Sequence, residues 1–246
     1  MARRYELITE LYERIQKGVT LPDKWQEFLS SACQNYKLPF DEQLLIYAQR
    51  PDATAVLEIE KWNGLLGRWV NRGVTGIAVF NKNLPNANRL KYYFDISDTH
   101  ESRLSRKVPI WEVEKIAFEE ITEALENSFG EVSTKEDFAD VLIFAAQNAC
   151  RDNAEDYISE IYKIRENSFL EELDDLNVSV ICQNLIENSV GYMLFKRCGL
   201  DPAKYFDDED FREITQFNTR EVLNAVGIAT GDISKMYLSE IARTVM

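Results

Sequence analysis

The segment 47–91, followed by Tyr92 and Tyr93, combines positive charge with aromatic rings. Seven Lys or Arg side chains alternate there with aromatic residues, and Asp52, Glu58 and Glu60 are the acids among them. Non-specific binding of a nucleic-acid single strand uses this combination, because cations neutralise phosphates while rings stack on bases. The candidate DNA-binding residues are Arg50, Trp62, Arg68, Trp69, Arg72, Gly73, Lys82, Arg89 and Lys91.

A purely structural interpretation of several of these residues stays open. Trp62 and Phe80 fit a hydrophobic core as well as they fit a stacking surface. Trp69 could equally lie in a core, with Arg68 simply solvated. Composition alone does not separate these alternatives.

Residues that could do catalysis are scarce. The chain has one histidine, His100, in a polar stretch, and the pattern contains neither a nucleophile elbow nor a Gly-rich phosphate loop. The four cysteines are far apart and lack metal-ligand spacing, so we expect buried free thiols. The acidic runs 207–210 and 171–175 are expected at helix N-termini or on solvated faces. We therefore expect no enzyme activity, no metal and no cofactor, although a nuclease built on the acidic runs is a third alternative.

Charge is distributed unequally along the 246 residues, whose net charge is −14. Residues 1–110 hold 16 Lys and Arg against 13 Asp and Glu, whereas residues 111–246 hold 12 against 29. A phosphate backbone would favour the first part and be repelled by the second. The two parts are thus expected to have different partners.

The first part needs helices and a small sheet to position its candidates. Apolar spacing predicts helices over 5–17, from Pro22 to about Tyr36, and over 41–49. In the second of these the apolar stripe is Trp25, Phe28, Leu29, Ala32, Cys33 and Tyr36. Beyond Pro51 the spacing of apolar residues no longer fits a helix. It predicts two strands, over 74–80 and 90–96, joined by a polar turn. The polar stretch 97–109, with His100, reads as a linker.

The remainder of the chain reads as helical. A capping box is predicted at Ser133–Glu136, a similar helix start at Asn218–Glu221, and a helix stop at Gly227. The predicted fold class is α+β, with helices packed on a small antiparallel sheet over residues 1–108, followed by an acidic all-α domain over residues 109–246. Hydrophobic residues make up 45% of the chain, which is enough for real cores.

No apolar run reaches the ~18 residues of a transmembrane helix. The first residues lead directly into a charged helical pattern rather than into the apolar core of a signal peptide. We therefore expect a cytoplasmic protein that does not engage a membrane.

A family resemblance extends these expectations. The run from Asp41 to Val56 (Asp-Glu-Gln-Leu-Leu-Ile-Tyr-Ala-Gln-Arg-Pro-Asp-Ala-Thr-Ala-Val), then Trp62, Leu-Gly-Arg-Trp-Val at 66–70 and Arg-Gly-Val-Thr-Gly-Ile at 72–77 resemble the N-terminal domain of ArdC-type antirestriction proteins. That domain is associated with single-stranded-DNA binding. The chain is also similar to the extreme N-terminal region of large proteins of conjugative elements, which carry helicase-like and methylase-like domains.

The resemblance implies a non-enzymatic single-stranded-DNA-binding module of a mobile element. Its family pattern has a second Lys where this chain has Arg72-Gly-Val-Thr-Gly76, which implies weaker phosphate binding. The zinc-peptidase-like domain of ArdC proteins has no counterpart here, so no metal activity carries over. Protein partners would be a helicase or methylase domain. The main alternative is an acidic inhibitor that binds a host defence nuclease as a DNA mimic.

Overall fold

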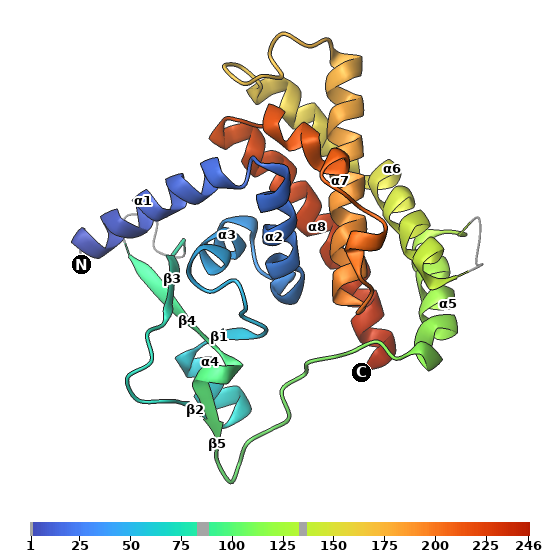
Figure 1. The fold of residues 1–246 in the computed structure, drawn as a ribbon. Coiled ribbons are helices and arrows are strands. Elements are labelled where there is room, and N and C mark those ends of the chain that lie inside the picture. The colour runs from blue at the N-terminus through green and yellow to red at the C-terminus, as the bar shows by residue number, and fades with distance from the viewer. Residues whose placement is uncertain (1, 83–88, 133–136) are drawn as a thin grey trace.

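The computed structural model describes residues 2–82, 89–132 and 137–246, and Figure 1 shows their arrangement. The helices are α1 (Ala2–Gly18), α2 (Pro22–Ala32), α3 (Phe40–Gln49), α4 (Ile59–Leu66), α5 (Phe118–Phe129), α6 (Phe138–Ile164), α7 (Asp175–Arg197) and α8 (Arg220–Val245). The strands are β1 (Val56–Glu58), β2 (Arg68–Val70), β3 (Ile77–Phe80), β4 (Leu90–Asp95) and β5 (Thr99–Glu101). The predicted α+β part followed by helices is confirmed.

The strands form two small antiparallel sheets. In the first, β4 lies between β1 and β3, and Ile77 is opposite Tyr93. The two predicted strands are β3 and β4, each shorter than expected. In the second, β2 pairs with β5, with Trp69 opposite His100. We call this second sheet the ribbon; it lies beside α4, at the bottom of the view in Figure 1.

The predicted apolar stripe of α2 is confirmed. All six of its residues are buried, and the stripe continues into a 3₁₀ turn over Cys33–Asn35. The indole N–H of Trp25 donates to Ser189 Oγ at 2.8 Å, a residue of α7. Burying an indole is favourable only when its polar N–H finds such a partner.

One hydrophobic core therefore extends across the predicted boundary at 108/109. Helix α2 packs against α7, and α3 packs against α8. Tyr12 and Gln16 of α1 both donate to Asn224 Oδ1 of α8. The boundary does not coincide with a gap in the core, although the α+β part and the helical part are recognisable as sequence regions.

Gly227 was predicted to end a helix. It lies instead inside α8. A Cβ at this position would overlap the ring of Phe40, so glycine permits the close approach of α3 to α8. Helix α8 begins after Thr219, which makes no side-chain capping bond. The capping box predicted at 133–136 lies outside the described residues, and α6 starts with Asp137 as its N-cap, whose side chain accepts from Asp140 N.

The stretch 97–109 is not simply a linker. It begins with a 3₁₀ turn over Ile96–Asp98 and continues into β5, which places His100 on a strand. Ser102 and Ser105 hydroxyls both donate to the carbonyl of Gly67, the left-handed residue (φ 61°) that ends α4. The polar composition of 97–109 therefore did not indicate β5, nor the hydrogen bonds that hold the residues after it against the end of α4.

Candidate nucleic-acid interface

The nine candidate residues do not form one surface. Lys82, Arg89 and Lys91 lie at the β3–β4 hairpin, beside α1, whereas Arg68, Trp69, Arg72 and Gly73 belong to the ribbon and its following turn (Figure 1). Arg50 and Trp62 lie between these groups and take part in internal contacts. Only some of the candidates can therefore act together on one strand.

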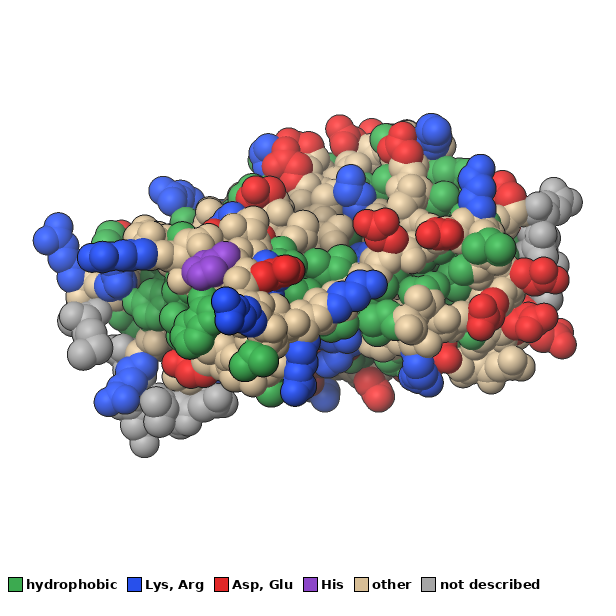
Figure 2. Space-filling view, turned by 90° about the horizontal axis from the view of Figure 1, so that it is seen from below, with side chains coloured by type: hydrophobic (Ala, Val, Ile, Leu, Met, Phe, Trp, Pro, Cys, Tyr) green, Lys and Arg blue, Asp and Glu red, His purple; other side chains and the backbone are tan. Residues whose placement is uncertain are grey.

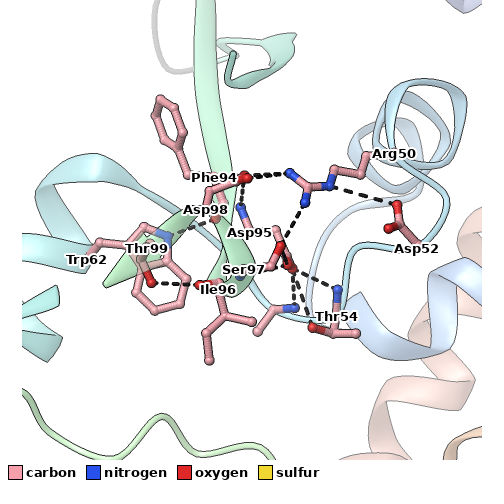
Figure 3. Close-up of polar contacts among 11 residues, drawn as sticks. Arg50, Asp52, Thr54, Trp62, Phe94, Asp95, Ile96, Ser97, Asp98 and Thr99 are labelled. Atoms are coloured by element: carbon pink, nitrogen blue, oxygen red, sulfur yellow. Dashed lines mark hydrogen bonds and ion pairs between the residues drawn. The ribbon is translucent and has the colours of Figure 1, made fainter. Parts of the chain in front are cut away.

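Trp62 is a core residue. Its side chain is fully buried, and its indole N–H donates to the carbonyl of Phe94 at 2.8 Å (Figure 3). Its rings have no exposed face for a base. The prediction that Trp62 stacks on DNA is wrong in this conformation, and the core alternative holds.

Arg50 is engaged inside the protein. Its guanidinium donates to both carboxylate oxygens of Asp98, at 2.7 and 2.6 Å, and to Ser97 Oγ (Figure 3). This bonding raises the pKa of Arg50. Such a charge-assisted pair is strong and specific in geometry. Arg50 therefore ties the end of α3 to the turn after β4 instead of offering a charge to phosphate.

Asp95 belongs to the same hydrogen-bond network as Arg50 and Asp98. It is buried and accepts from the backbone N–H groups of Thr54, Ala55 and Ser97 (Figure 3). Burial acts to raise the pKa of Asp95, but these hydrogen bonds outweigh it and leave the pKa below its ordinary value. The ionised carboxylate is thus the form that stabilises the fold.

We expect Asp95→Asn to lower the free energy of unfolding by about 1–3 kcal/mol at neutral pH, because an amide cannot replace both acceptor oxygens. The folded-state pKa is lowered, so the stabilisation is present above the unfolded value of ~4 and is lost as the pH falls through the folded value. Thermal melts of wild type and variant should therefore converge on acidification. Asp52→Asn is the control, since that carboxylate is 81% exposed and pairs weakly with Arg50 at 3.8 Å. A difference in melting temperature that stays constant from neutral to acid pH would contradict this role.

Three further candidates are ion-paired. Arg68 is nearly buried and donates to Thr99 Oγ1 and Glu101 Oε1, both at 2.8 Å. Lys91 contacts Glu42 Oε1 at 2.8 Å in a site where both side chains are mostly buried. Lys82 pairs with Asp41 at 3.1 Å but remains 68% exposed. Arg68 and Lys91 are thus structural, whereas Lys82 keeps access to solvent.

Trp69 remains as an exposed aromatic candidate. Its side chain is 52% exposed, and its cross-strand neighbour His100 is exposed too. Directly opposed residues on one face of an antiparallel pair have Cβ atoms about 5 Å apart. Asn71 Oδ1 lies 2.7 Å from His100 Nδ1 and helps to orient the imidazole. The ribbon thus offers two adjacent rings to solvent, a platform that core packing does not explain.

Exposed cations lie in the segments that follow the two strands of the ribbon. Arg72 and Gly73 are exposed in the turn after β2, and Gly73 has a φ of 87° that favours glycine. Arg103, Arg106 and Lys107, which follow β5, are exposed as well. They were not predicted as binding residues because their polar stretch has the composition of a linker. Among the described residues none of these four cations has an ion-pair partner. Arg103, Arg106 and Lys107 lie close to His100 in the sequence, and this clustering could have indicated them as candidate binding residues.

We define the ribbon surface as Trp69, Arg72, His100, Arg103, Arg106 and Lys107. Figure 2 looks at the molecule from this side. Lys and Arg predominate around the histidine, next to exposed apolar side chains, while Asp and Glu predominate towards the other end of the same face. The charge asymmetry of the sequence is therefore also an asymmetry of the surface. Arg89 is exposed directly before β4, away from this surface.

The cysteines and the two acidic runs are the remaining groups with possible chemistry. All four cysteines are buried and free, as predicted, and burial raises the pKa of each thiol to about 12. Asp207–Glu209 are exposed at the start of a 3₁₀ helix, and Asp174 caps α7, which confirms the expected helix ends. Within the described ranges, no three His, Cys, Asp or Glu residues are grouped to hold a metal, and no helix has the length and apolar character to cross a bilayer.

Comparison of the chain with protein-family models, with curated protein sequences and with solved structures finds no match.

Proposed function

We propose that this chain is a non-enzymatic module that binds single-stranded DNA through the ribbon surface. The observation that carries the proposal is the exposed Trp69–His100 pair, with four exposed cations in the segments that follow its two strands and no ion-pair partner for them among the described residues. Rings supply stacking that tolerates any base, and cations supply phosphate contacts. The setting in antirestriction or conjugative transfer rests on the resemblance to ArdC-type proteins.

The net charge of −14 does not oppose local binding at this end. Electrostatic interactions between exposed charges are largely screened beyond about 8–10 Å at physiological salt. Phosphates held at the ribbon surface therefore respond mainly to the cations beside them. The acidic helical part repels the remaining length of the strand, which favours one orientation of the DNA and leaves that part for a protein partner.

Trp69→Ala tests the stacking half of the proposal. We expect the affinity of the full chain for a short oligothymidylate to fall by about 1–3 kcal/mol, with an unchanged salt dependence. The melting temperature should stay close to that of wild type because the side chain is half exposed. Fluorescence anisotropy across a salt series measures both quantities.

Two control variants separate stacking from folding. Trp69→Phe should retain most of the affinity, since the ring face is kept. Trp25→Phe should lower the melting temperature, because the hydrogen bond to Ser189 is lost, without changing DNA affinity. A folded Trp69→Ala variant that binds as tightly as wild type would remove the platform from the proposal.

One observation favours the alternative of an acidic inhibitor. Asp152, Glu155, Asp156 and Glu160 of α6 are all exposed and spaced to lie along one helical face. Arg151 and Lys163 neutralise part of this row through ion pairs with Asp152 and Glu160. Absence of binding between the wild-type chain and oligothymidylate at low salt would favour this alternative, in which the row contacts a basic nuclease channel.

A further inference from the structure

A pocket lies close to the ribbon surface, between the turn after α2, α4 and the segment 108–111. Its volume is about 370 Å³, within the range of small-molecule sites. Apolar side chains from three parts of the chain form its walls, among them Val56, Leu65 and Ile110. Leu65 is 60% and Ile110 41% exposed, so apolar surface is open to a ligand at the mouth.

The charge of this pocket is opposite to that of the whole chain. Among the described residues that line it there is no carboxylate, whereas Lys37 and Arg197 contribute positive charge. The larger cavity of about 620 Å³ between α1, α3 and α8 differs, because acids such as Glu13 and Asp232 are mixed with its cations. The smaller pocket therefore favours an electron-rich or anionic ligand.

Two buried donors of this pocket have no hydrogen-bond partner among the described residues. They are the hydroxyl of Tyr36, a residue only 4% exposed, and Nε of Arg197. The Arg197 guanidinium lies 3.5 Å from the centre of the Trp111 ring, and burial lowers its pKa. Buried polar groups without partners are costly, so a ligand that supplies acceptor atoms would stabilise this arrangement.

The pocket adjoins exposed cations that can hold phosphate. Arg106 and Lys107 directly precede Val108, which lines the pocket. The backbone N–H of Arg106 donates to the carbonyl of Leu66 at 2.9 Å, so the basic segment is fixed against α4 at the pocket wall. A strand whose phosphates contact these two cations brings its bases to the mouth.

We propose that this pocket accepts one unstacked base of the bound single strand. The inference rests on the proposed function. A base fits the site because its planar body suits apolar walls, while its carbonyl oxygens and ring nitrogens accept hydrogen bonds from Tyr36 and Arg197. Its phosphates remain on Arg106 and Lys107, so the pocket adds a base contact to the phosphate contacts of the ribbon surface.

The test compares two strands of equal length, an oligothymidylate and its abasic counterpart, which keeps the phosphates but lacks bases. Arg197→Met retains a long apolar side chain but removes the donors. Ala55→Leu fills the pocket that Ala55 lines. Each variant should bind the thymidylate strand about tenfold more weakly, bind the abasic strand like wild type, and keep the wild-type salt dependence. Lys196→Met is the matched control on an exposed neighbour and should leave the preference for bases intact.

The outcomes distinguish the two proposals. Folded pocket variants, verified by their melting temperatures, that bind both strands like wild type would overturn the base pocket and leave the ribbon proposal standing. A wild-type chain that binds both strands equally would also overturn it. A wild-type chain that binds neither strand would overturn the proposed function and the pocket with it. If Arg197→Met fails to fold, Ala55→Leu decides the question.

Discussion

Joint replacement of Arg72, Arg103, Arg106 and Lys107 by alanine is expected to abolish most single-stranded-DNA binding. Each lost phosphate contact flattens the slope of log K against log salt by about 0.7, so the four together flatten it by about 2.8. At about 0.1 M salt this corresponds to a loss of roughly two to three powers of ten in affinity. All four side chains are exposed and lack ion-pair partners among the described residues, so the fold should tolerate the change.

A variant with the same change in net charge provides the control. Arg151, Lys163, Lys204 and Arg212 are exposed on the helical part, distant in sequence from the ribbon. Their joint replacement by alanine should alter the salt slope little. Salt titrations of wild type and both variants against the same labelled oligothymidylate measure the difference. Equal losses in the two variants would show that net charge, and not the ribbon surface, governs binding.

Gly227→Val is expected to give the largest loss of stability of any single change considered. Its side chain would collide with the buried ring of Phe40, and neither α3 nor α8 can move away without opening the core. Overpacking of this kind costs about 3 kcal/mol or more, which lowers the melting temperature of a chain of this size by roughly 6–12 °C. Denaturant unfolding of the full chain gives the free energy directly.

The same helix contains a matched control one turn later. The nearest atom to a Cβ at Gly231 is Gln43 Oε1 at 3.9 Å, which is ordinary contact. Gly231→Ala should therefore be neutral or stabilise by up to about 1 kcal/mol, since alanine favours helix. Phe40→Leu should recover part of the stability lost in Gly227→Ala, a coupling visible in a double-mutant cycle. Additive effects of Phe40→Leu and Gly227→Ala would contradict the steric explanation.

The sequence predicted those elements whose patterns are local. The stripe of α2 and the strands β3 and β4 followed from apolar spacing and turn residues. Helix α4 was missed because it has eight residues with Gly64 among them, and only the C-terminal Gly67 indicated its end. Gly227 was assigned as a helix stop because a sequence does not show which ring packs against a glycine. Such close contacts are set by tertiary packing.

Tertiary contacts also explain why only part of the candidate site could be predicted from the sequence. Interleaved cations and rings indicated a segment in which Trp69 and Arg72 are exposed. Composition could not show that Arg50 and Arg68 are bound to Asp98 and Glu101, because those acids are far away in the chain. Nor could it show that pairing of β5 with β2 brings the basic segment after it to the ribbon. Burial and strand pairing decided which cations remain available.

The single core also constrains how the chain is made. Trp25 can bond to Ser189 only after most of α7 has been synthesised, and Phe40 can pack against Gly227 only after the first turns of α8 have followed. At ribosomal rates of about 5–20 residues per second, apolar side chains of α2 and α3 wait roughly 10–40 s for their partners. During that interval the nascent N-terminal part exposes an incomplete hydrophobic surface, which is the kind of surface that chaperones bind. Separation in sequence between contacting helices thus becomes a delay in time, and the N-terminal helices complete their core only after α7 and the start of α8 have been made.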